Sequence, residues 1–257
     1  MKKGVIHMIL REPEILSVND HIWLLNDNNE ATGYVIAGTR YAAVIDTMIG
    51  LVDVRAITEE LTDLPLTLIN THGHIDHIGG NWGFEKAFRN LADQAVAEKS
   101  LSHPQVEEAI ELYNLVFPAF ENIADEQEFD LGEIILTAYH FPGHTPGEIV
   151  LFDKKDRILF SGDGVLEQLW LQLPESMSVE VQIKSMERLL PLREDFDTIL
   201  SGHSRQKENA ELFDTLLDAL KEIRDKPCIC DTSYSWWGGE ALAHQYGQGV
   251  RRVVYNN

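Results

Sequence analysis

The chain has 257 residues, of which 44% are hydrophobic and 25% are charged, and its formal net charge is −21 at pH 7. These values are typical of a globular protein with a sizeable core, and the length suits one large domain or two small ones. No apolar run approaches the ~20 residues that a membrane-spanning helix needs. The negative charge disfavours nucleic acids and anionic membranes as partners, because phosphate binding needs patches of Lys and Arg.

The N-terminus and the cysteines bear on the compartment. The first residues include Lys2 and Lys3, but the apolar run that follows is short and is interrupted by His7, which argues against a signal peptide. Cys228 and Cys230 are too few for a disulfide framework and too close in sequence for an unstrained mutual bond. The sequence therefore predicts a cytoplasmic protein with reduced thiols, with a Cys-x-Cys metal site as the alternative.

The first quarter of the chain has the pattern of an antiparallel meander. Turn-prone groups separate short apolar runs, which is typical of consecutive strands. A segment with helical apolar spacing follows, and then a buried strand. The predicted strands are Val5–Leu10, Ile15–Val18, Ile22–Asn26, Gly33–Ala37, Tyr41–Ile45 and Leu64–Ile69, and the helix is Val52–Leu61.

The rest of the chain alternates between helical and strand patterns. Residues 84–125 are predicted to be mostly helical, with Val106–Asn122 as the clearest amphipathic part and Pro118 as the residue that bends or ends it. No repeat and no long linker divides the chain. We therefore predict a single domain over residues 1–257, with a helical insertion at about 84–125 and a C-terminal helix plus tail at about 207–257. The later strands are Glu133–Phe141, Glu148–Asp153, Ile158–Phe160 and Thr198–Leu200, and the later helices are 178–192 and about 207–225.

A histidine cluster directly follows the strand that ends at Ile69. Its four potential metal ligands, which fall within six residues, are His72, His74, Asp76 and His77. In an extended backbone His72, His74 and Asp76 point the same way, while His77 points elsewhere. Ligand side chains that point in two directions suit two neighbouring metal ions better than a single ion. The alternative is a polar surface loop.

Three more ligand-type residues occupy similar places. His144, Asp163 and His203 each lie in a glycine-containing turn after an apolar strand. Each alone is more typical of a hydrogen-bonded turn. Together with the histidine cluster they place seven ligand-type side chains at the ends of different strands. Asp46 also follows a strand, and the sequence leaves open whether it caps a helix, forms a turn or orients a ligand.

The combination resembles the metallo-β-lactamase-fold hydrolase superfamily. Asp46, the His-x-His-x-Asp-His run at 72–77, His144, Asp163 and His203 carry this resemblance over nearly the whole chain. It implies an α+β fold, an αββα four-layer sandwich of two mixed β-sheets with helices outside. It also implies a first metal held by His72, His74 and His144, a second held by Asp76, His77 and His203, and Asp163 as a bridge.

The ligand types indicate the chemistry. Imidazole and carboxylate ligands suit zinc, and also iron or manganese. Two such divalent ions would hold a bridging hydroxide that attacks a carbonyl, and Asp76 is expected to orient this nucleophile and handle its proton. The predicted function is therefore a dinuclear metal-dependent hydrolase that acts on an ester, thioester or lactone of a small molecule.

The turn sequences look most like the glyoxalase II and lactonase-like branches. The chain has no Cys-Gly-His-Glu-Tyr-like stretch and no long Lys/Arg-rich C-terminal helical domain, which argues against glutathione thioesters. One alternative is a mononuclear iron persulfide dioxygenase that uses His72, His144 and Asp163. A phosphodiesterase and a non-catalytic metal-binding scaffold are the others. The sequence leaves the oligomeric state open.

Aromatic residues gather in the last third of the chain. Trp170, Tyr234, Trp236 and Trp237 either form an apolar rim for an acyl chain or pack a tail over the core. The sequence favours packing but does not decide between the two.

Overall fold

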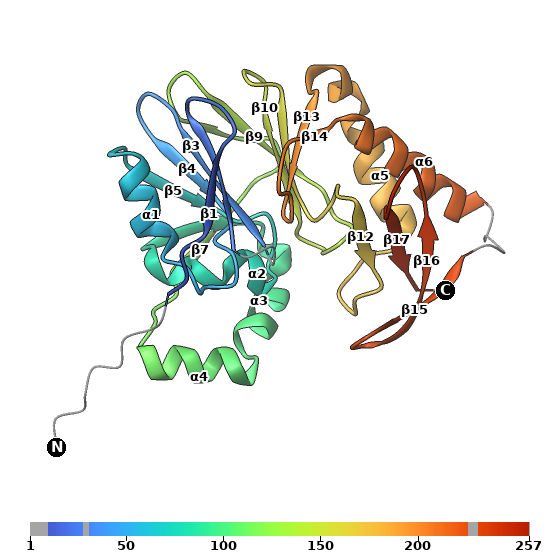
Figure 1. Cartoon of the computed structure of the whole chain (residues 1–257), viewed down its shortest axis with the longest axis horizontal. Coiled ribbons are helices and arrows are strands. Elements are labelled where there is room, and N and C mark those ends of the chain that lie inside the picture. Colours follow the sequence, from blue (N-terminus) through green and yellow to red (C-terminus); the bar gives the residue numbers. More distant parts are fainter. Residues whose placement is uncertain (1–9, 28–30, 226–230, 257) are drawn as a thin grey trace.

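The structure is a computed structural model that describes residues 10–27, 31–225 and 231–256. Two large β-sheets pack face to face, and helices lie on the outer face of each (Figure 1). The sheets contain both antiparallel and parallel pairs. This arrangement agrees with the predicted αββα sandwich of two mixed sheets. Val5 and its neighbours, together with Cys228 and Cys230, fall outside the described residues.

The first sheet contains the predicted meander and extends it. Its strands are hydrogen-bonded in the order β1 (Glu14–Ser17), β2 (Ile22–Asn26), β3 (Thr32–Ala37), β4 (Ala42–Ile45), β5 (Leu66–Ile69), β6 (Lys86–Arg89) and β7 (Ala119–Asn122). The pairs from β1 to β4 are antiparallel, whereas β4, β5, β6 and β7 run parallel. The carboxyl ends of β4 and β5 therefore meet at one edge of the sheet, which brings Asp46 beside the histidine cluster.

The second sheet brings its own turns to a common edge. Its order is β14 (Glu208–Asn209), β13 (Thr198–Ser201), β11 (Ile158–Gly162), β10 (Ile149–Asp153), β9 (Ile135–His140) and β8 (Gln127–Asp130). Because β10 is antiparallel to both β9 and β11, and β13 is parallel to β11, the strands β9, β11 and β13 point the same way. The turns that follow these three strands carry His144, Asp163 and His203.

Helices cover both outer faces of the sandwich. Helix α1 (Val54–Leu61) lies against the first sheet, while α5 (Val179–Leu189) and α6 (Glu211–Asp225) lie against the second (Figure 1). The Asp53 side chain accepts a hydrogen bond from the Ala56 amide and so caps α1. The other helical segments are α2 (Ile75–Ile78), η1 (Gly79–Gly83), η2 (Leu91–Asp93), α3 (Gln94–Leu101), α4 (Pro104–Tyr113) and η3 (Leu190–Asp195).

The central strands are buried on both faces. In β2, adjacent Leu24 and Leu25 point to opposite faces, yet both are buried. Leu24 joins the cluster between the sheets, with Leu151 and Phe160 of the second sheet, whereas Leu25 joins the cluster beneath α1. Burial on both faces explains why these strands are continuously apolar rather than alternating.

The segment 84–125 differs from the mostly helical prediction. It contains α3 and α4, but its two ends are β6 and β7, which pair with each other at the edge of the first sheet. Helix α4 ends at Tyr113 because Asn114 adopts a left-handed conformation with φ 52, before Pro118 is reached. Phe117 precedes a proline and is thereby steered toward extended backbone, which leads into the strand.

A third sheet near the C-terminus was not predicted. Its order is β12 (Gln168–Leu171), β17 (Arg252–Tyr255), β16 (Gly239–Gln245) and β15 (Thr232–Trp236). The tail is thus a folded part of the molecule next to the second sheet (Figure 1). None of the described helices is both long and apolar enough to cross a bilayer.

Candidate metal centre

The seven side chains predicted as metal ligands lie close together, at the edge of the sandwich where loops from both large sheets meet. Four of them come from the loop after β5 and the start of α2, and the other three come from the turns after β9, β11 and β13. They form three overlapping groups in which the ligand atoms lie within 4.8 Å of one another. These groups are His72, His74 and His144; His72, His77 and Asp163; and Asp76, His77 and His203.

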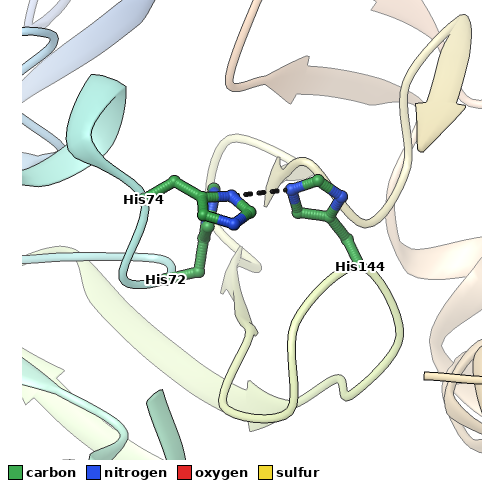
Figure 2. Close-up of side chains that lie close together, drawn as sticks. All are labelled: His72, His74 and His144. Carbon is green, nitrogen blue, oxygen red and sulfur yellow. Dashed lines mark hydrogen bonds between the residues drawn. The ribbon is translucent and has the colours of Figure 1, made fainter. Parts of the chain in front are cut away.

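The first group consists of three imidazole rings (Figure 2). His74 Nδ1 lies 3.0 Å from His72 Nε2 and 3.0 Å from His144 Nε2. Ligands of one tetrahedral zinc ion with bonds of ~2.0–2.1 Å are separated by roughly 3.3 Å. The three nitrogen atoms are therefore close to the spacing that a single ion requires.

Asp163, a member of the second group, lies close to imidazoles of all three groups. Its Oδ2 is 3.1 Å from His203 Nε2 and 3.7 Å from His144 Nε2, while its Oδ1 is 3.5 Å from His77 Nε2. Gly202 makes this approach feasible, since a Cβ atom there would lie 2.3 Å from Asp163 Oδ1. One carboxylate thus faces imidazoles of every group.

Two buried polar atoms of the proposed ligands make no hydrogen bond within the described part of the chain. These atoms are His77 Nε2 and Asp163 Oδ1. An unpaired buried polar atom normally costs about 1–3 kcal/mol. A donor set of imidazoles and carboxylates with vacant lone pairs fits a divalent cation. The residues present therefore suit the metals that the sequence pattern implies.

The protonation of the rings differs between the groups. Burial and neighbouring imidazoles lower the pKa of His72 below its ordinary value and lower that of His144 to about 4. Burial has the same effect on His77 and His203, but Asp163 and Asp76 outweigh it, so the pKa of His77 is raised and that of His203 rises to about 9. Near pH 7 the rings of His72 and His144 are therefore neutral.

Asp46 orients one of these rings. Its Oδ2 accepts hydrogen bonds from His77 Nδ1, at 2.8 Å, and from the Thr71 hydroxyl, at 2.7 Å, and its Oδ1 accepts one from the Thr71 amide. Asp46 has a positive φ of 58 and is fully buried. Of the interpretations that the sequence left open, the structure selects the carboxylate that orients a histidine.

Asp93, which the sequence analysis missed, connects the two histidine-bearing loops. Its Oδ2 accepts from the Gly73 amide at 2.8 Å and from the Thr145 hydroxyl at 2.7 Å, and its Oδ1 accepts from the Gly147 amide at 2.5 Å. Gly73 lies between His72 and His74, and Thr145 follows His144. The buried carboxylate therefore fixes the first sheet's loop against the second sheet's turn.

Two glutamates were also missed. Glu175 Oε1 accepts from His74 Nε2 at 3.0 Å, and this hydrogen bond, with a further one from Lys99, lowers the pKa of Glu175 to about 2. Glu148 is fully buried, and its Oε1 accepts from the Asp163 amide at 2.7 Å. Neither residue belongs to a local ligand pattern, although Glu148 directly follows the Thr-Pro-Gly run after His144.

The centre opens into a cavity of about 660 Å³. Asp76, His74, His144 and His203 are at its floor. Helix α3 and His103, which directly precedes α4, form one wall, and residues around β12 and the β15–β16 turn form the other. Pockets of ~300–1,000 Å³ are typical of small-molecule sites.

Comparisons with known proteins agree with this centre. The family model described as the metallo-beta-lactamase superfamily matches residues 29–203, which include all seven side chains. An acyl-coenzyme A thioesterase of Bos taurus is 29% identical over 205 residues, covering 68% of this chain and 73% of the relative. A hydroxyacylglutathione hydrolase of Haemophilus influenzae is 34% identical over 162 residues, covering 56% of this chain and 71% of the relative.

Solved structures share the fold. A metallo-beta-lactamase from Pontibacter korlensis has a TM-score of 0.62 at 18% identity, with 81% of this chain and 99% of that chain covered. One from Erythrobacter litoralis has a TM-score of 0.62 at 17% identity, with 82% and 97% covered. With a family model that matches most of its length and a sandwich shared with these structures, the chain belongs to the metallo-beta-lactamase superfamily.

Proposed function

We propose that this chain, an enzyme of the metal-dependent hydrolase class, holds two divalent metal ions and hydrolyses an ester, thioester or lactone of a small molecule. The observation that carries the proposal is the set of overlapping three-ligand groups at the floor of the cavity. Of the relatives described above, one is named a thioesterase and the other a hydrolase of hydroxyacylglutathione, which makes acyl thioesters the first class to test.

In this proposal His72, His74 and His144 hold the first ion, and Asp76, His77 and His203 hold the second, with Asp163 between them. Three imidazoles are a common zinc donor set, and the mixed second set also admits iron or manganese. The support for Asp163 as the bridge is that its two oxygens face different groups.

Two bound cations would lower the pKa of a water molecule toward ~7 and polarise the carbonyl oxygen of the substrate. The chain's own residues do the rest. Asp46 and Glu175 hold His77 and His74 in fixed orientations. Asp76 is partly exposed to the cavity, where its carboxylate can orient the attacking water and accept its proton.

The proposal also covers the type of partner, the location and the domain organisation of the enzyme. The net charge of −21 supports a small molecule rather than a nucleic acid as the partner. Location in the cytoplasm, deduced from the sequence, remains part of the proposal. So does the organisation of residues 1–257 as one domain, which the continuous core between the two large sheets supports.

The test combines metal content with a substrate panel. Protein purified without chelator should contain about two zinc or manganese ions per chain and should hydrolyse at least one acyl thioester, ester or lactone. His74→Ala should lose metal and activity together. His21→Ala is the matched control, because His21 pairs with Asp156 away from the centre. A single iron with oxygen consumption on persulfides would overturn the proposal, and so would full metal content without any hydrolysis.

A further inference from the structure

The turn of the β15–β16 hairpin places an exposed tryptophan at the cavity. Trp237 and Gly238 form the two-residue turn between Trp236 and Gly239, which are paired across the hairpin. Trp237 is 81% exposed, the most exposed of the large apolar side chains in the described part of the chain, and it lines the cavity above the centre. A solvated indole beside an active site offers apolar area that a ligand can cover.

The wall behind Trp237 is mainly apolar and well supported. It also contains Leu166, Trp170 and Leu173, with Glu167 and Gln168 between the first two. Trp170 packs against the small cluster of Ala241, Ala243 and Val254 in the third sheet, as do Tyr234 and Trp236. The Trp236 and Trp237 rings meet edge to face, with centroids 4.7 Å apart and planes at 70°. Trp170 and Trp237 thus line the cavity, whereas Tyr234 and Trp236 pack against the third sheet, and Trp170 does both.

The facing wall has a different character. It consists of Val96, Lys99 and Ser100 of α3, with His103 just before α4. Lys99 is held by Glu175, with Nζ 2.9 Å from Oε2. The cavity is thus asymmetric, with a largely polar helical wall opposite a mainly apolar wall that is built around β12 and the β15–β16 hairpin.

The apolar wall begins directly beside the candidate centre. The backbone oxygen of Trp170 accepts a hydrogen bond from His144 Nδ1 at 2.8 Å. The carbonyl group of a substrate bound at the floor of the cavity would therefore have apolar side chains on one side and polar side chains on the other. An acyl chain fits the first side, and a polar leaving group fits the second.

We propose that the β15–β16 hairpin is an acyl-chain subsite, in which Trp237 covers an unbranched apolar acyl group of several carbons that lies against Trp170 and Leu173. This inference rests on the proposed function and names the substrate class of the same centre. It makes Trp237 a determinant of specificity that touches the substrate. The hairpin lies beyond residue 203, the last that the family model matches, so the superfamily resemblance does not imply it.

The test uses one leaving group and a graded acyl chain. Thioesters of N-acetylcysteamine from acetyl to decanoyl are assayed with the metal-loaded full chain. In the parent protein kcat/KM should rise about two- to fourfold for each added methylene until the wall is covered. Trp237→Ala should lower kcat/KM for decanoyl at least about tenfold and for acetyl less than about twofold. Trp237→Phe should restore most of the loss, and metal content should not change.

Tyr41→Ala is the matched control, since Tyr41 is an exposed aromatic residue at 45% that does not line the cavity. A flat dependence on chain length overturns the inference, as does an equal loss for acetyl and decanoyl substrates in Trp237→Ala. Binding of decanoate and butyrate by calorimetry decides the matter if no thioester is hydrolysed. Tighter binding of decanoate that depends on Trp237 would then support the subsite while the proposed reaction fails.

Discussion

At the scale of single residues, the candidate centre depends on carboxylates that are not themselves proposed as ligands. Asp46 accepts a hydrogen bond from His77 Nδ1 and so leaves Nε2, which makes no hydrogen bond itself, facing the other groups. A change at Asp46 should therefore act on the metal through the orientation of His77.

Replacing Asp46 with Asn should weaken the second metal. The amide can donate to His77 Nδ1 and favour the wrong tautomer, so the affinity for the second ion should fall about 10–100-fold. Competition with a coloured chelator measures this. Asp53→Asn is the control, because Asp53 only caps α1. Unchanged affinity for both ions would refute the orienting role.

Asp93 should matter for both stability and metal. Asp93→Ala removes three hydrogen bonds and leaves the Gly73 and Gly147 amides unpaired in a buried place. The free energy of unfolding should fall by about 2–5 kcal/mol, as urea titration of the metal-free protein would show. Thr145→Val removes one of the three bonds and should cost less. Equal stability of Asp93→Ala and the parent would contradict the role of this connection.

The seven proposed ligands were accessible from sequence because they are clustered or follow apolar strands. Asp93 and Glu175 were not, since their partners lie far away along the chain and no local spacing marks them. Such contacts exist only after the sheets have packed. Trp237 was predictable only in part. Its residue type singled it out in the sequence, but its position at the cavity became evident only from the β15–β16 hairpin of the structure.

At the scale of elements, the turn between β10 and β11 contains a buried charge. Asp153 is fully buried, and its Oδ1 accepts from the amides of Lys155 and Asp156, while Oδ2 has no hydrogen-bond partner among the described residues. Burial, with the nearby charge of Asp156, raises the pKa of Asp153 from 3.8 to about 6. The folded chain thus binds this proton more tightly than the unfolded chain, and the resulting stabilisation is lost as the pH rises through about 6.

Asp153→Asn should therefore stabilise the protein in a pH-dependent manner. Asn keeps the Oδ1 acceptor and removes the charge, so the free energy of unfolding should rise by about 1–3 kcal/mol at pH 8 and change little near pH 4. Urea titrations at several pH values measure the difference. Asp63→Asn, at an exposed position, serves as the control. A gain that is equal at both pH values would show that the buried charge is not its source.

The elements that sequence located best are those with strong local patterns. Strands β2 to β5 and helix α1 were placed within a few residues, since continuous apolar runs and an Asp cap mark them. Strand β7, with the exposed sequence Ala119 to Asn122, has no such pattern and extends the sheet only by pairing with β6. Edge strands of this kind are determined by their neighbour rather than by their own residues.

At the scale of the whole molecule, the candidate centre joins the two halves of the sandwich. Both proposed metals would take ligands from the first sheet's loop and from the second sheet's turns. A bound ion stabilises the folded state alone, by about 4 kcal/mol when its concentration is ~1,000 times the dissociation constant.

Removing the metals should accordingly lower the melting temperature on the order of 10 °C. Calorimetry of the metal-loaded protein, with and without a chelator, measures this. Magnesium, which favours oxygen ligands, is the control and should not restore the loss. Identical transitions for the chelated and loaded protein would argue against metals that connect the two sheets.

The overall architecture was predictable because superfamily resemblance and strand patterns agree. The third sheet was not, since β12 pairs with β17 across a long stretch of chain and β15 alternates polar and aromatic residues. Long-range pairing of this kind leaves little trace in a local window.

Because the proposed ligands come from distant parts of the chain, they are synthesised at different times. During synthesis the four side chains after β5 emerge first, His144 follows, and His203 comes last. The three histidines of the first group therefore exist before the second group is complete. A nascent chain would therefore acquire its metals in sequence, and it could hold the second ion only after β13 and His203 have been synthesised.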